Sequence, residues 1–141
     1  MDRHNLFSGV VIGHDTQRSI TFLRWHGLTL ETRHQPEFAA GRRVSWMIPA
    51  EDVILHRRER PSRGERENPV SGTVVEVMAF GERTTVLIDI TRQRQQTLMM
   101  TVPTHVARRN TIGPGVAVTV SLLAEGIHLM PYEVLRKGRR D

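Results

Sequence analysis

The sequence predicts an all-β protein made of two small β-barrels in tandem. Three observations support this fold class: one stretch occurs twice, apolar and polar residues alternate with a period of two, and no segment is long enough for crossover helices. A period of two buries one face of a strand. Parallel sheets instead need connections of a dozen or more residues, which are usually helical. Antiparallel barrels therefore fit the pattern better than an α/β arrangement.

The repeat shows that one unit is built twice. Residues 115–129 repeat residues 41–55 at an offset of 74, and residues 68–75 echo residues 5–12 at an offset of 63. A repeat of this length is typical of a duplicated supersecondary unit. We expect the two units to share an interface, because each is close to the lower size limit for independent folding.

The first unit contains three strands before its repeated stretch. Residues 6–12 are rich in β-branched and apolar residues, and residues 13–18 have the composition of a turn or loop. Two further strands are expected at 19–25 and 28–33, because His26-Gly27 between them suits a tight hairpin.

The second unit follows the same plan and adds one helical candidate. Residues 84–90 and 116–122 alternate as half-buried strands do, and Val44, Trp46 and Ile48 are expected to point inward in the first copy. The segment 104–110 is the one place where a short helix is expected.

Charge and composition define the remaining parts. Residues 57–67 are charged, contain Pro61 and Gly64 and carry no apolar residue, so they are expected to form a linker rather than a basic contact surface. The predicted organisation is thus a first barrel over 1–56, the linker over 57–67, a second barrel over 68–135 and a basic tail over 136–141.

Composition also excludes several functions. The 141-residue chain has 38% hydrophobic and 25% charged residues, a net charge of +5 and no cysteine. It contains no run of about 18 apolar residues that could span a membrane. The sequence contains neither a P-loop motif nor a nucleophile elbow, so neither a P-loop nucleotidase nor a hydrolase is expected within these residues. The absence of cysteine fits a cytoplasmic protein.

The order of the motifs resembles the tandem TOBE or molbindin domains, also called di-Mop domains. Each unit opens with Asn-x-x-Ser-Gly-x-Val, at Asn5 and at Asn68, and ends with Gly-x-x-Val followed by a β-run containing Ala-Glu. The resemblance implies that each barrel is five-stranded and OB-like. It further implies a C-terminal regulatory and dimerisation domain of an ABC importer ATPase subunit that senses molybdate or tungstate.

The candidate oxyanion ligands are two asparagines that match family positions, two residues beside such positions and one further hydroxyl. The candidates are an arginine, two asparagines and two hydroxyl residues: Arg66, Asn68, Asn5, Ser121 and Thr104. Backbone N–H groups, hydroxyls and a cationic side chain can hold such an anion with neither a metal nor a cofactor. Where the family carries Lys-Ala-Ser or Lys-Ala-Thr, this chain has Leu123-Ala124-Glu125, and a carboxylate at that place repels a dianion. Alternatively, the asparagines only fix turns.

Two other functional classes are left open by the residues. Phe22, Arg24, Trp25 and His26 could form a stacking platform for single-stranded nucleic acid, although no nucleic-acid partner is expected. A ligand-free dimerisation module is the other alternative. The histidines show neither an i, i+4 pair nor a nearby cysteine, so no metal site is expected. The expected partners are a second copy of the chain, the ABC ATPase domain and the permease subunits, with no insertion into the membrane.

Overall fold

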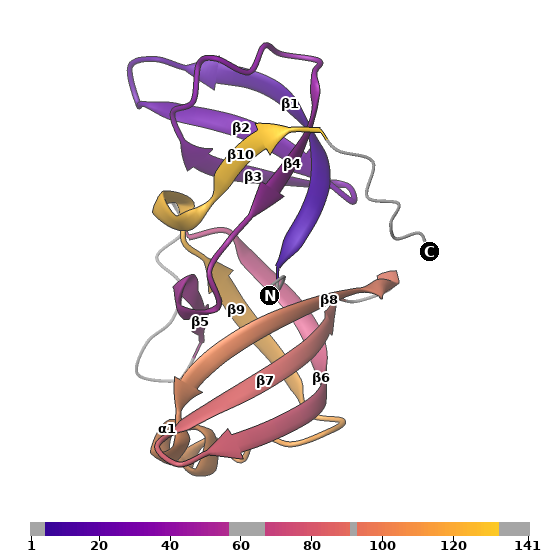
Figure 1. Cartoon of the computed structure of the whole chain (residues 1–141), viewed down its shortest axis with the longest axis vertical. Coiled ribbons are helices and arrows are strands. Elements are labelled where there is room, and N and C mark those ends of the chain that lie inside the picture. The colour runs from indigo at the N-terminus through magenta and orange to yellow at the C-terminus, as the bar shows by residue number, and fades with distance from the viewer. Residues whose placement is uncertain (1–4, 57–66, 91–92, 133–141) are drawn as a thin grey trace.

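The chain forms two curved five-stranded sheets that lie end to end (Figure 1). The structure, a computed structural model, describes residues 5–56, 67–90 and 93–132. The first sheet has the strand order β10-β4-β1-β2-β3 and the second the order β5-β9-β6-β7-β8. The strands are β1 (Leu6–Asp15), β2 (Ile20–Trp25), β3 (Leu28–Arg33), β4 (Arg43–Met47), β5 (Val53–Leu55), β6 (Pro69–Phe80), β7 (Arg83–Ile90), β8 (Gln93–Pro103), β9 (Ala117–Leu122) and β10 (His128–Pro131). The predicted all-β class with two OB-like units is confirmed; we call the sheets the first and second barrel.

The hairpin and the helix predicted from the sequence are both present. β2 and β3 pair antiparallel, with Trp25 opposite Leu28. The two turn residues between them, His26 and Gly27, have φ angles of 49° and 79°, as a type I′ turn requires. The short helix α1 (Thr104–Arg109) falls inside the segment expected to be helical.

The first strand is longer than predicted. β1 continues to Asp15, so the expected turn over 13–18 is wrong in its first part. The register with β2 shifts between Val11 and Gly13, and such a bulge lets a strand bend and continue. The turn begins only at Asp15, whose carboxylate accepts hydrogen bonds from the N–H groups of Gln17 and Arg18 at 3.1 Å each.

The two barrels exchange their last strands. β5 is the last part of the first repeated stretch in sequence but pairs with β9 of the second barrel, from Val53 opposite Leu122 to Leu55 opposite Val120. β10 begins at the end of the second repeated stretch but pairs with β4 of the first barrel. Two short 3-10 helices, η1 (Ala50–Asp52) and η2 (Ala124–Gly126), carry the chain across. The sheets therefore do not coincide with the sequence ranges 1–56 and 68–135, which stay a prediction for the domain boundaries.

The core follows the predicted alternation. Val44, Trp46 and Ile48 are fully buried, as expected for inward positions of the first copy. Leu122 and Val120 are buried in the second copy. No described helix is long and apolar enough to cross a membrane. Of the expected linker, residues 57–66 lie outside the described residues.

Candidate functional site

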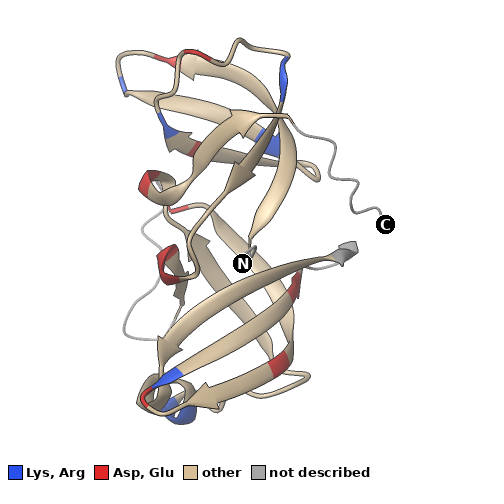
Figure 2. Ribbon diagram, viewed as in Figure 1, with Lys and Arg blue, Asp and Glu red and all other residues tan. Residues whose placement is uncertain are grey.

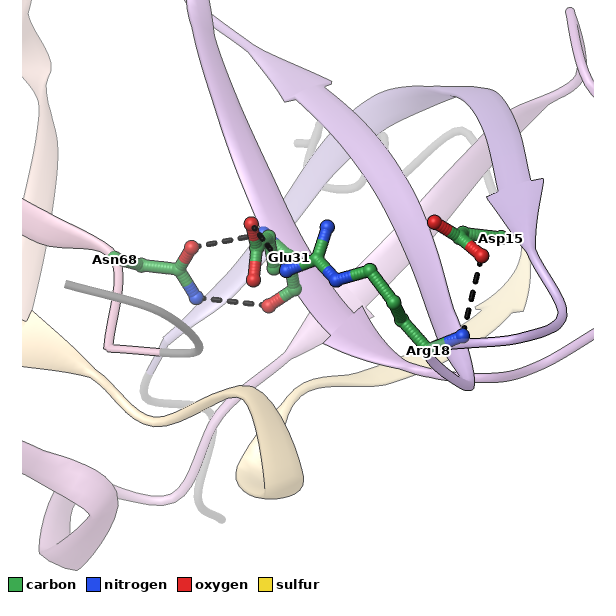
Figure 3. A network of polar contacts seen from close by, with 4 residues as sticks. All are labelled: Asp15, Arg18, Glu31 and Asn68. Carbon is green, nitrogen blue, oxygen red and sulfur yellow. Dashed lines mark hydrogen bonds and ion pairs between the residues drawn. The ribbon is translucent and has the colours of Figure 1, made fainter.

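Asn68 bonds the second barrel to the edge strand of the first. It is buried, lies just before β6 and has a φ of 45°, a left-handed conformation that asparagine tolerates better than most residues. Its Oδ1 accepts from the Glu31 N–H, and its Nδ2 donates to the carbonyls of Glu31 and Leu122, each at 2.8 Å. Figure 3 shows the amide directed at the backbone of Glu31. The side chain of Glu31 meanwhile pairs with Arg18 at 3.5 Å.

Asn5 makes the matching contact in the opposite direction. It lies just before β1 with a φ of 57° and is also buried. Its Oδ1 accepts from the Met99 N–H at 2.7 Å, and its Nδ2 donates to the Met99 carbonyl at 2.8 Å. Each asparagine thus caps the edge strand of the other barrel, as a neighbouring antiparallel residue would. A ligand could reach these amides only by competing with buried hydrogen bonds, so their role as oxyanion ligands stays a prediction.

Ser121 lies in a small polar cluster at the interface between the barrels. It is buried although its place in the alternation of β9 is outward, because His56 and Glu67 cover it. His56 Nε2 lies 2.6 Å from the Ser121 hydroxyl, which donates to the Glu67 carboxylate at 3.3 Å. Pro69 pairs with Ser121 across the sheet, so Asn68 and Ser121 are close neighbours.

The other two predicted site residues do not join this cluster. Thr104 begins α1 at the far end of the second barrel (Figure 1), where its hydroxyl contacts Thr84 at 2.9 Å and donates to the Gly81 carbonyl at 2.8 Å. Arg66 lies outside the described residues. The structure therefore brings Asn68 and Ser121 together, places Asn5 in the matching position of the first barrel, and separates Thr104 from all three.

The two 3-10 helices at the junction of the barrels carry carboxylates. Figure 2 shows carboxylate residues on both 3-10 helices at the junction, whereas the arginines of the described ranges lie mainly toward the outer ends of the molecule. Glu51 and Glu125, where a binder of the family would offer a hydroxyl, are both exposed. An oxyanion at this interface would meet these carboxylates, and among the described cations Arg18 reaches the interface through its pair with Glu31. Within the described ranges, no three histidine, aspartate or glutamate residues are grouped so that they could hold a metal ion.

One residue of the predicted stacking platform for nucleic-acid bases, Trp25, is buried. Trp25 is buried in the first barrel beside Trp46, with ring centroids 5.1 Å apart in an edge-to-face arrangement. Phe7 packs 5.0 Å from each of these rings. Trp25 therefore belongs to the core and offers no face on which a base could stack.

Sequence reasoning missed the partners of the predicted residues. Glu31 and Met99 contribute backbone groups, which leave no signal in the side-chain pattern. No motif marks His56 as a partner of Ser121, and its place directly before the predicted linker is the only sequence signal.

Two strand-exchanged OB-like barrels whose interface is joined by reciprocal asparagines define a class of tandem β-barrel domains. Residues 46–130 match the family model described as TOBE domain, so the chain belongs to the TOBE domain family. The fold is that of the cytoplasmic molybdate-binding protein ModG, in a crystal form with molybdate bound, at a TM-score of 0.80 and 17% sequence identity. That match covers 94% of this chain and 99% of the ModG chain. No curated protein matches the sequence.

Proposed function

We propose that this chain is a non-catalytic sensor of a tetrahedral oxyanion, molybdate or tungstate, and that it binds the anion at Ser121. The single observation that carries the proposal is the position of the Ser121 hydroxyl between His56 and Glu67. These two residues delimit the segment 57–66, which contains five arginines in ten residues. His56 and Glu67, the two partners of the hydroxyl, thus flank in sequence the segment of the chain that is richest in arginine.

The contacts of Ser121 suit an anion. Its hydroxyl already donates to a carboxylate oxygen of Glu67, and an oxyanion oxygen accepts the same kind of hydrogen bond. An incoming dianion would have to displace that carboxylate, because two like charges repel at this distance. Arginine suits the opposite side of such a site, since its planar fork can bind two oxygens at once. Arg66, one residue before Glu67, is the arginine that we assign to this role.

The biological setting that we propose is the ABC importer. The TOBE family supports a C-terminal regulatory and dimerisation domain of an ATPase subunit that sits beside permease subunits at the cytoplasmic face of the membrane. In this setting the chain would act as a homodimer, and the oxyanion would report intracellular supply to the transporter.

Titration calorimetry with molybdate, tungstate and sulfate tests the proposal. We expect heat from molybdate or tungstate that sulfate does not reproduce. Ser121→Ala should weaken binding about tenfold, since it removes one hydrogen bond to a charged group. Glu67→Gln should strengthen it, because the neutral amide no longer repels the anion. Ser71→Ala is the matched control, because this serine is exposed on β6 and contacts only Thr119 among the described residues. Binding that is unchanged in Ser121→Ala would place the anion elsewhere.

A ligand-free dimerisation module is a second candidate, which one observation favours. The side chains of Asn5, Asn68 and Ser121 all have internal partners. In that case no oxyanion produces heat or raises the melting temperature, while sedimentation shows a dimer whose population depends on concentration.

A further inference from the structure

The first barrel is closed by a side-chain amide. Gln35 follows β3 and is buried between β3 and β10. Its Nε2 donates to the Ile127 carbonyl at 3.3 Å and to the Arg33 carbonyl at 3.1 Å, and its Oε1 accepts from the Leu129 N–H at 2.9 Å. In a parallel sheet, one residue of a strand bonds to a carbonyl and to an N–H of the neighbouring strand, and these two groups belong to residues two positions apart. The Gln35 amide therefore substitutes for one residue of a missing strand beside β10.

The second barrel has no such amide at the matching position. Glu31 and Met99 correspond, because each is capped by the asparagine of the other barrel. Four residues further along the chain, Gln35 corresponds to Pro103. Proline has no carboxamide and no N–H. At this place the second barrel has a groove of about 330 Å³ between β5 and β8, which we call the β5/β8 groove.

The backbone of β5 presents a carbonyl and an N–H, two residues apart, to this groove. The His56 N–H donates to Thr119 in β9 at 2.9 Å, so by the alternation of an antiparallel ladder Ile54 also faces β9. The Val53 carbonyl and the Leu55 N–H therefore point away from β9, toward β8. They match the Ile127 carbonyl and the Leu129 N–H that Gln35 engages. Among the described residues, no side-chain hydrogen bond reaches either group.

The wall of the groove that β8 forms also presents backbone N–H and carbonyl groups. Met99 in β8 directs its N–H and carbonyl to Asn5, away from β7, so Thr101 two residues on directs its backbone groups to the same side. Thr101 lines the groove, as Arg33 borders Gln35 in the first barrel. Both walls thus offer backbone hydrogen-bonding groups.

The rest of the lining is apolar with two opposite charges. Ile54, Leu55 and Val106 contribute apolar surface, and Glu51 and Arg83 add one charge of each sign. A volume of about 330 Å³ accommodates a few residues of an extended chain. One lining charge of each sign favours an occupant without net charge.

We propose that the β5/β8 groove binds a short, uncharged extended peptide, which adds to β5 as a parallel strand. One residue of the peptide donates its N–H to the Val53 carbonyl and accepts from the Leu55 N–H, as the Gln35 amide does in the first barrel. Main-chain bonds of this kind give affinity in strand addition, and the apolar walls select the side chains. The occupant is thus a peptide segment, bound independently of the oxyanion.

Amide NMR with a capped tripeptide tests this directly. The probe is acetyl-Val-Leu-Val-amide, and the control is the same peptide N-methylated at the leucine, which lacks the N–H donor. We expect the Leu55 and Thr101 amide signals to shift with the first peptide and to stay in place with the second. Equal shifts with both peptides would overturn the proposal. So would slow hydrogen exchange at Leu55 without any peptide, because the chain itself would then fill the groove.

Two variants separate binding from folding. Pro103→Gln adds a carboxamide where Gln35 stands in the first barrel and should weaken peptide binding about tenfold, the effect of one or two lost hydrogen bonds. Ile54→Phe should fill the groove and weaken binding as well. Pro131→Gln, at an exposed strand end of the first barrel, is the matched control and should bind as the parent does. The indole signals of Trp25 and Trp46 report intact folding. Undiminished binding in both groove variants would refute the assignment.

Discussion

The two barrels share their interlocking parts and differ in how each one closes. Both begin with a buried asparagine that caps the opposite barrel, and each lends its last strand to the other. The gap beside the exchanged strand is bridged by Gln35 in the first barrel but remains a groove next to Pro103 in the second. The duplicated unit is therefore retained where backbone hydrogen bonds join the barrels and diverges where a single side chain closes one of them.

Strand exchange makes the two barrels depend on each other. Removing β5 from the second sheet would break its ladder with β9, and removing β10 would break the ladder with β4. Asn5 and Asn68 make five side-chain hydrogen bonds, and four of these join one barrel to the other. We therefore expect one cooperative unfolding transition rather than two.

The largest effect is expected from Asn68→Ala, which tests the reciprocity of the caps. It removes the three hydrogen bonds of a buried side chain and leaves the Glu31 N–H without its partner, so the free energy of unfolding should fall by about 3–5 kcal/mol. Asn5→Ala removes two and should cost about 2–3 kcal/mol. Urea denaturation measures both. Asn110→Ala removes one bond at the end of α1 and serves as the control. Equal losses in all three variants would show that the caps do not join the barrels.

A smaller effect is expected from Gln35→Ala, which tests the difference in closure. The variant leaves the Leu129 N–H and the Ile127 carbonyl without their partner, and should lower the free energy of unfolding by about 2–3 kcal/mol. Pro103→Ala at the matching position breaks no side-chain amide contact and should change it by less than about 1 kcal/mol. Thermal or urea unfolding distinguishes the two. If Gln35→Ala and Pro103→Ala lowered the free energy of unfolding by similar amounts, Gln35 would not close the first barrel.

The sequence predicts the fold well because the fold depends on patterns that the sequence displays. The alternation in residues 41–55 and 115–129 marks the strands, and the His26-Gly27 pair marks the hairpin. Strand exchange leaves no such mark, since β5 has the same apolar pattern whichever sheet it joins. Only its pairing partner differs, and pairing over long sequence distance is set by the whole chain.

The candidate site was predicted less completely, for a related reason. Asn5, Asn68 and Ser121 were selected as side chains, and all three lie at the interface between barrels. Their partners are mainly backbone groups of edge strands and a histidine from the exchanged segment. Such groups become neighbours only after the barrels interlock, so a single sequence cannot identify them.

The repeated Ser-Gly pair tests how closely the two copies pack, and the effect expected there is no larger than that of Gln35→Ala. Alanine at Gly72 would place a methyl group against the Asp89 carbonyl and within 2.6 Å of the Ile88 side chain, whereas at Gly9 the nearest atom, the Arg24 carbonyl oxygen, is 2.8 Å away. Overpacking of this kind costs about 1–3 kcal/mol. Gly72→Ala should therefore lie near the upper end of that range and Gly9→Ala near the lower end. Gly13→Ala in the same strand as Gly9 meets no atom within 4 Å and is the control in urea denaturation. A larger loss for Gly9→Ala would show that the first barrel is the more tightly packed of the two.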